Sequence, residues 1–99
     1  MQDAEYHALV DALFYDLEDK IDNLDQDVEI DSEEGVLNIV FPNGTTIVIS
    51  RQIGNHEVWI AAKSGGYHLS REENNWRCKA TGETLMTLVN RVISEQLNT

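Results

Sequence analysis

Basic residues, cysteine and proline are scarce in this chain of 99 residues, which has seven Lys and Arg, one Cys and one Pro. The single cysteine, Cys78, excludes an internal disulfide and every zinc or iron–sulfur site that needs several cysteines from one chain. We therefore expect a reducing compartment. A chain without a basic stripe also does not match proteins that bind nucleic acid through its phosphates.

Long apolar runs are absent too. None approaches the roughly 20 residues that a transmembrane helix needs, and the residues before Glu5 form neither a signal peptide nor an Arg-rich transit peptide. We expect a cytoplasmic protein that does not bind membranes. The length and a hydrophobic fraction of 41% predict a single domain over residues 1–99.

The charge of the chain is concentrated in one segment. Thirteen of the 18 acidic residues lie in the first 34 positions, where Lys20 is the only base, so this third has a net charge of −12. The remaining 65 residues hold five acids and six bases and are close to neutral. Segregated charge sets up a directed field that attracts cations and basic partner surfaces. The alternative is a solvated face that serves solubility, which is what charge runs usually are.

Apolar residues at three- and four-residue steps predict an N-terminal helix that ends at 25–27. Its stripe consists of Tyr6, Leu9, Val10, Leu13, Phe14, Leu17, Ile21 and Leu24. At about 100° per residue, Asp11, Glu18 and Asp22 fall in one narrow arc beside this stripe, with His7 at its edge. The helix is thus expected to bury one side and to present carboxylates on the other.

From Asp27 the period changes to two, because acids alternate with Val28 and Ile30. A strand here turns its carboxylates one way and its apolar residues the other. Further strands are predicted by alternation between turn signals, at 36–41, 46–51, 57–62, 67–70 and 76–79. Asn43-Gly44 is the strongest of these turn signals.

A second helix is predicted at the C-terminal end. Thr81 is expected to cap it through its hydroxyl, with Glu83 near the positive end of the helix dipole. Its apolar stripe consists of Leu85, Leu88, Val89, Val92, Ile93 and Leu97. The connections between strands are too short for crossovers. We therefore predict an α+β fold, a two-layer α/β sandwich in which an antiparallel six-stranded sheet carries both helices on one face.

Several local strings resemble the frataxin family, and its bacterial branch in particular. Residues 3–7 (DAEYH) lead into an acidic helix, and 25–27 (DQD) lead into the alternating acidic strand. Residues 56–68 (HEVWIAAKSGGYH) are similar to the central strand-turn-strand of the family. Nearer the C-terminus, residues 76–78 (WRC) and 81–85 (TGETL) also resemble the family. Many relatives have Asn-Lys-Gln before the central tryptophan, where this chain has Asn55-His56-Glu57.

The resemblance implies a function that composition and periodicity do not reach. Frataxins take part in iron–sulfur cluster assembly, and the bacterial members are described as iron-responsive regulators. They bind iron weakly, as Fe²⁺ or Fe³⁺, through carboxylates of the first helix and first strand. Their acidic surface docks on a basic patch of the cysteine desulfurase, and the iron–sulfur scaffold protein is a further expected partner. The protein is expected to be a monomer without metal and not an enzyme.

The candidate metal ligands form what we call the acidic ridge, namely Asp11, Glu18, Asp19, Asp22, Asp25, Asp27, Glu29, Asp31 and Glu33. His7 could add a nitrogen ligand. Oxygen ligands suit hard or borderline cations such as iron, Mn²⁺ and Ca²⁺. Because the acids are spread along a helix and a strand, we expect weak, exposed sites. They would adjoin one another if the first strand lies beside the first helix.

The candidate docking residues are Glu18, Asp19, Asp22, Asp25 and Trp59. Alternation places Trp59 on the sheet face opposite to Val58 and Ile60, where a tryptophan can anchor an interface. The alternative is a ring packed over its cross-strand neighbours. Metal on the acidic ridge would neutralise the charge that a basic partner recognises, which suggests that iron occupancy modulates docking.

The remaining candidates point to ordinary structural roles. Trp76 is expected to be structural, His56 and His68 belong to no metal-binding pair, and Cys78 is expected to be a half-buried thiol. Two alternatives to an iron-binding regulator remain open. One is a purely electrostatic interaction module in which metal is incidental. The other is an enzyme such as a ferroxidase, which the absence of a converging His and carboxylate motif disfavours.

Overall fold

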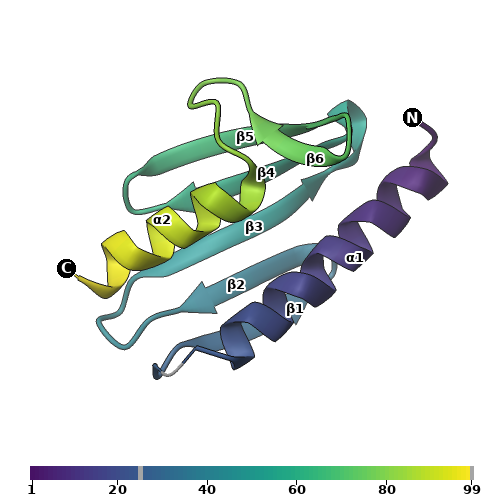
Figure 1. Ribbon diagram of the computed structural model, residues 1–99. Coiled ribbons are helices and arrows are strands. Elements are labelled where there is room, and N and C mark those ends of the chain that lie inside the picture. Colours follow the sequence, from purple (N-terminus) through teal and green to yellow (C-terminus); the bar gives the residue numbers. More distant parts are fainter. Residues whose placement is uncertain (25, 99) are drawn as a thin grey trace.

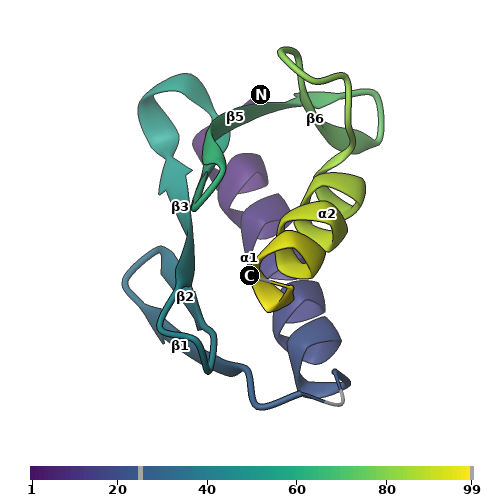
Figure 2. The ribbon, with the colours of Figure 1, turned by 90° about the vertical axis from the view of Figure 1, so that its left-hand side faces the viewer.

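The computed structural model describes residues 1–24 and 26–98. Within these residues the chain forms α1 (Asp3–Asp22), β1 (Glu29–Glu33), β2 (Val36–Val40), β3 (Thr46–Gln52), the 3₁₀ helix η1 (Ile53–Asn55), β4 (Glu57–Ala62), β5 (Gly65–Glu72), β6 (Asn75–Cys78) and α2 (Leu85–Leu97). The six strands form one antiparallel sheet whose spatial order follows the sequence. Both helices cover the same face of it (Figures 1 and 2). The predicted two-layer α+β architecture is confirmed.

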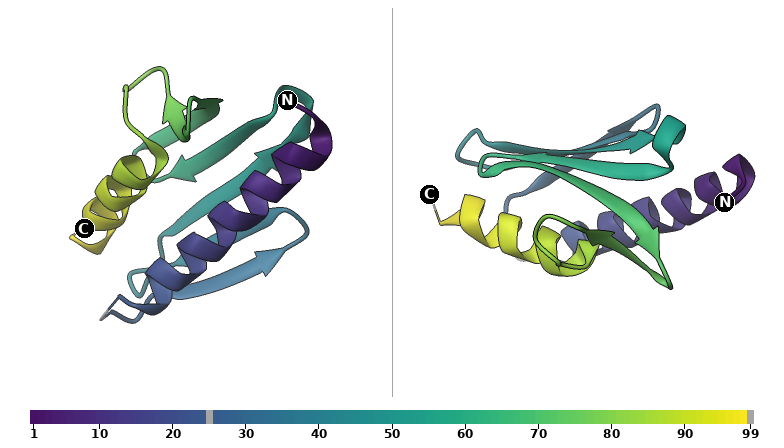
Figure 3. Two further views of the ribbon diagram at one scale, coloured as in Figure 1. Left: turned by 45° about the vertical axis from the view of Figure 1, so that its right-hand side comes forward. Right: turned by 90° about the horizontal axis from the view of Figure 1, so that it is seen from above.

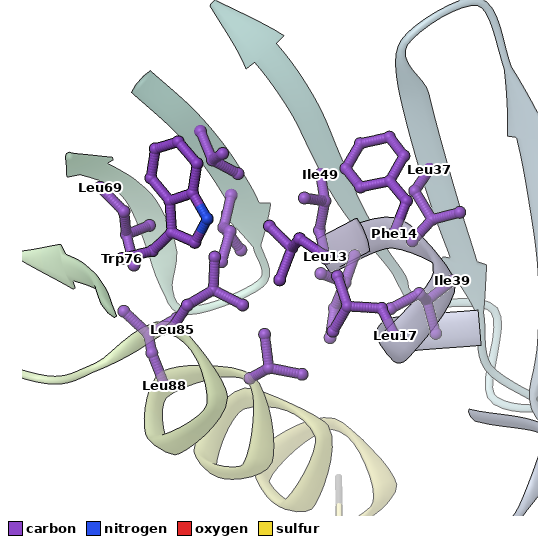
Figure 4. Packing of buried hydrophobic residues seen from close by; sticks show 14 of the residues in the cluster. Leu13, Phe14, Leu17, Leu37, Ile39, Ile49, Leu69, Trp76, Leu85 and Leu88 are labelled. Atoms are coloured by element: carbon purple, nitrogen blue, oxygen red, sulfur yellow. The ribbon is translucent and has the colours of Figure 1, made fainter. Parts of the chain in front are cut away.

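The core lies between the helices and the inner face of the sheet. Alternate strand residues point inward and are almost fully buried, among them Leu37, Ile39, Ile47, Ile49, Val58, Ile60 and Leu69. Leu13, Phe14 and Leu17 of α1 pack over Leu37 and Ile39 (Figure 4). At the other end of the core, Trp76 lies beside Leu69, Leu85 and Leu88 (Figure 4). Trp76 is therefore structural, as predicted.

Six residues of the predicted stripe of α1 are buried, and Leu9 and Leu24 are partly buried against the core. The helix ends at Asp22, before the predicted end at 25–27, so Leu24 lies just after it. Tyr6 fixes where the helix begins on the sheet. Its hydroxyl donates to the carbonyl of Glu57 (2.6 Å) and accepts from the backbone N–H of Gln52 (2.9 Å). Burial raises the pKa of this hydroxyl. From this anchor α1 runs across β1 and β2 (Figures 1 and 3).

The prediction that Thr81 caps α2 is wrong. Gly82, at φ 78°, turns the chain, and Thr84 then forms an isolated bridge with Arg77. The helix therefore begins later, and the side chain of Thr84 accepts the N–H of Thr87 as its cap. The buried stripe includes Gln96, which the sequence did not predict. No helix in the described ranges is long and apolar enough to cross a membrane.

The turn between β1 and β2 lies among the acidic residues and is only two residues long. Glu33 pairs with Val36, which leaves Glu34 and Gly35 as a two-residue loop. Both have positive φ, 23° and 81°, as a type I′ hairpin turn requires. The Asn43-Gly44 hairpin is confirmed, but its loop is longer and Gly44 supplies the positive φ of 87°. The side chain of Asn43 accepts the N–H of Thr45 (3.0 Å).

Candidate functional site

The helix part of the acidic ridge lies on the solvent side of α1. Asp11, Asp19 and Asp22 are exposed and Glu18 is half-buried. The apolar stripe turns inward, so these carboxylates stand clear of the core. Asp25 lies outside the described residues.

The strand part of the acidic ridge faces the other side of the sheet. Ile30 and Ser32 pair with Ile39 and Leu37, whose side chains are fully buried under the helices. The residues between them, Glu29, Asp31 and Glu33, therefore point to the outer face, and all three are exposed. Asp27, before β1, is exposed as well. The predicted alternation is confirmed.

The helix part of the acidic ridge comes close to the chain at the β1–β2 turn. A surface hollow of about 370 Å³ lies there, bounded by α1, the turn and β3. Of the predicted residues, it brings together Asp11, Glu18 and Glu33. Its other lining residues are Phe14, Tyr15, Ser32, Glu34, Gly35, Val36 and Arg51. The side chains of Glu29, Asp31 and Glu33 all point to the face away from the helix, so the ridge is not one continuous ligand set.

Glu34 and Arg51 belong to this hollow and were not among the predicted site residues. Glu34 lies in the two-residue turn between β1 and β2. The sequence does contain a signal for Arg51. It lies two residues after Ile49 in the same strand, so its side chain points to the same inner face as those of Ile47 and Ile49. A charged residue at an apolar parity usually has a partner.

The guanidinium of Arg51 crosses from β3 to α1. Its Nη2 donates to a carboxylate oxygen of Asp11, and its Nη1 lies 3.0 Å from Nδ1 of His7. A guanidinium has only donors, so Nδ1 of His7 is the acceptor in this contact. Two of the predicted metal ligands therefore already have a cationic partner within the chain.

Tight metal coordination is not built into the described part of the chain. Among residues 1–24 and 26–98, no group of three or more His, Cys, Asp or Glu side chains is arranged to hold a metal ion. The hollow instead offers separate carboxylates at an open surface. Such an arrangement can attract a hydrated cation but does not replace its whole water shell.

Trp59 lies on the outer face of the sheet, as the alternation predicted. Its indole stacks on the imidazole of His68, the residue opposite on β5, with ring centroids 4.2 Å apart and planes 8° apart. Its Nε1 donates to the carboxylate of Glu57 (2.9 Å). The ring is half-buried by these contacts. It thus packs over a cross-strand neighbour and still presents part of its surface.

The lesser candidates have structural contacts. His56 has a left-handed backbone (φ 50°), and its Nε2 lies 2.7 Å from the carboxylate of Asp3. Cys78 is buried, with 1% of its surface exposed, and is more deeply covered than the expected half-buried thiol. Its side chain is therefore part of the core.

The comparisons with known proteins agree with this architecture. A sequence model described as the frataxin-like domain matches residues 1–99. The chain belongs to the frataxin family. A solved structure of frataxin from Psychromonas ingrahamii, studied as a model of stability modulation within the CyaY protein family, is similar at a TM-score of 0.91 and 31% identity. The match covers 97% of this chain and 91% of that frataxin. The frataxin family is associated with iron–sulfur cluster assembly and is generally non-enzymatic.

Proposed function

We propose that this frataxin is an iron-responsive regulator of iron–sulfur cluster assembly in the cytoplasm. It binds iron weakly on the acidic ridge, as Fe²⁺ or Fe³⁺, and docks on the cysteine desulfurase. The iron–sulfur scaffold protein is a further partner. The family association supports the pathway, and the placement of the carboxylates supports the role of the ridge.

The observation that carries the proposal is the gathering of acidic residues from α1 and from the β1–β2 turn around one surface hollow. Asp11, Glu18, Glu33 and Glu34 line it. Carboxylate oxygens are the donors that hard and borderline cations prefer. The hollow is open to solvent, so a hydrated iron ion can approach these side chains without losing its water shell.

Docking on the desulfurase uses two separate features. The acidic ridge steers a basic partner by its field, an effect that fades with salt. Trp59, with Glu18, Asp19, Asp22 and Asp25, gives the contact. Iron on the ridge lowers the negative charge that the desulfurase meets, so iron occupancy modulates docking.

The test is a titration of the ¹⁵N-labelled protein with Fe²⁺ under anaerobic conditions, followed by NMR. We expect selective broadening of Glu18, Glu33, Glu34 and their neighbours on α1 and β1. The desulfurase affinity is then measured with and without iron at fixed ionic strength. No localised broadening at millimolar iron would disprove the metal role, and an unchanged desulfurase affinity would disprove the link between iron and docking.

A purely electrostatic interaction module is the second candidate. The lack of a converging ligand group in the described residues favours it. In that case, salt weakens desulfurase binding while iron, at matched ionic strength, leaves it unchanged. The same pair of titrations separates the two functions.

A further inference from the structure

Arg71 of β5 is a base that faces the covered side of the sheet. It lies two residues after Leu69 and pairs with Trp76 of β6, and both of these side chains are buried under the helices. Its guanidinium carbon lies 5.7 Å from the centre of the Trp76 ring. Arg51 faces the same side and has Asp11 as its partner, whereas Arg71 makes no ion pair with any described residue. The guanidinium of Arg71 therefore retains its hydrogen-bond donors for a ligand.

The indole of Trp76 supplies a second donor without a partner. The residue is 4% exposed, and its Nε1–H is buried and has no acceptor in the described part of the chain. The nitrogen lies on the side of the ring that faces Leu13 (Figure 4). The other indole, that of Trp59, donates to Glu57. Because a buried donor without an acceptor is unfavourable, Trp76 indicates an acceptor that comes from outside the chain.

Both donors line one small hollow at the start of α2, with a volume of about 100 Å³. It is bounded by α1 at Leu13, by the β5–β6 turn, and by Leu85 and Met86, the first two residues of α2. None of the described residues that line it is acidic, in a chain whose net charge is −11. The first N–H groups of a helix have no acceptor within it and lie at the positive end of its dipole. Those of Leu85 and Met86 therefore favour an anion in the hollow.

We infer that this hollow binds a small oxyanion such as inorganic phosphate. Guanidinium, indole and backbone N–H groups only donate hydrogen bonds, so together they suit the oxygens of a tetrahedral anion and not a cation. Pockets for organic ligands are about 300–1,000 Å³, so a hollow of about 100 Å³ suits only a small ion.

The Nε1–H of Trp76 is covered in the structure. The ion therefore reaches it through a small shift of the Arg71 side chain, which lies over the ring. Once bound, the anion joins the first turn of α2 to β5 and β6 through shared hydrogen bonds. This site is separate from the acidic ridge, and the inference does not rest on the proposed function.

The two indole signals of the ¹⁵N-labelled protein test this inference in one NMR spectrum. The protein is titrated at neutral pH with sodium phosphate and, separately, with NaCl at the same ionic strength. We expect the Trp76 Nε1–H signal and the Met86 amide signal to move together and to saturate with phosphate alone. The Nε1–H of Trp59, which already donates to Glu57, is the internal control and should not follow. A Trp76 signal that does not saturate, or that responds equally to NaCl, would overturn the inference.

The variants Arg71→Gln and Lys79→Gln separate a direct contact from a change in net charge. Each loses one positive charge. Lys79 is exposed, lines a different hollow and makes no ion pair with a described residue. We expect Arg71→Gln to weaken phosphate binding about tenfold, as the loss of a charge-assisted hydrogen bond does, and Lys79→Gln to weaken it less than about twofold. Equal losses would attribute binding to overall charge and would refute the site.

A water molecule is the alternative occupant of the hollow. Its signature is a cross-peak between the Trp76 Nε1–H and water that phosphate leaves unchanged, and this result would contradict the inference. Loss of that cross-peak as phosphate saturates supports it. If Arg71→Gln does not fold, Arg71→Lys keeps the charge but not the planar donor group. A lowered phosphate affinity of Arg71→Lys supports the inference, and an unchanged affinity contradicts it.

Discussion

Gln96, near the end of α2, accepts a hydrogen bond on its side-chain Oε1 from the backbone N–H of Lys63 in the β4–β5 turn (3.0 Å). Its Nε2 donates to the hydroxyl of Thr45 (2.9 Å), and its own carbonyl accepts from the side chain of Asn43 (2.6 Å). This amide is 1% exposed. It therefore fastens the last turn of the helix to two turns of the sheet.

Gln96→Leu should lower the free energy of unfolding by about 2 kcal/mol. It leaves the backbone N–H of Lys63 and the hydroxyl of Thr45 without the hydrogen bonds that the Gln96 side chain makes. Urea denaturation measures this. Ser94→Ala, an exposed change on the same helix, is the control and should shift stability by less than about 0.5 kcal/mol. Equal effects of the two changes would mean that the network contributes nothing beyond packing.

Glu34→Asn should stabilise the protein by about 0.5–1 kcal/mol, because asparagine tolerates the positive φ of this turn better than glutamate. Glu34→Gln removes the same charge but keeps the strained backbone, so the difference between the two variants isolates the turn. Thermal or urea unfolding of both gives the comparison. If Glu34→Gln stabilises as much as Glu34→Asn, charge repulsion and not backbone conformation is the cause.

The bidentate pair of Arg91 and Glu83 should make stability depend on pH. Both donor–acceptor distances are 2.9 Å, and the hydrogen bonds from Arg91 lower the pKa of Glu83 below its usual 4.5. A lowered folded-state pKa gives stability that is complete above the unfolded-state pKa and is lost as the pH falls through the folded one. Glu83→Gln should therefore cost about 1 kcal/mol at pH 7, a gap that closes in acid. A gap independent of pH would rule out the ionic contribution.

Salt should stabilise the wild type by screening the acidic third. Between about 10 mM and about 300 mM NaCl, we expect the Tm to rise by about 2–4 °C. Glu18→Gln should reproduce part of this gain at low salt, while Glu73→Gln, the same change on the neutral part of the chain, should not. Scanning calorimetry at both salt concentrations provides the measurement. A flat Tm would show that the ridge carboxylates do not repel one another appreciably.

If the outer face of the sheet docks the desulfurase, Trp59→Ala should weaken that complex at least roughly tenfold, as loss of an aromatic anchor does. The ring is half-buried on the surface, so the fold should persist. Ile53→Ala, at an exposed apolar residue of η1, is the control. Full binding by Trp59→Ala would leave the ridge as the sole contact.

The spacing of apolar residues in the sequence predicted the helices and strands. It also predicted which of their side chains face the core. The alternation from Asp27 placed Glu29, Asp31 and Glu33 on the outer face correctly, because side-chain direction in a strand depends on local geometry alone. The partnership of Arg51 with Asp11 could not be read in this way. It depends on which strand lies under which turn of α1, and that follows from the register of the whole sheet.

Local signals also failed where a nearby alternative competed. Thr81 and Thr84 are both good cap residues, and the chain uses Thr84 because its bridge with Arg77 extends the sheet by one more pair. Gln96 was missed because a buried amide has no periodic signal. It is stable there only through partners from two distant turns.

The position of β1 has a consequence for how copies of the protein behave in solution. β1 is the outermost strand of the sheet at one side, so one row of its backbone groups has no neighbouring strand within the sheet. An edge strand with unpaired backbone groups can pair with a strand of a second molecule. Natural proteins reduce such pairing by placing charged side chains on the edge strand. A second copy aligned there would place its Glu29, Asp31 and Glu33 against those of the first. We therefore expect the carboxylates of β1 to oppose the addition of one molecule to the next.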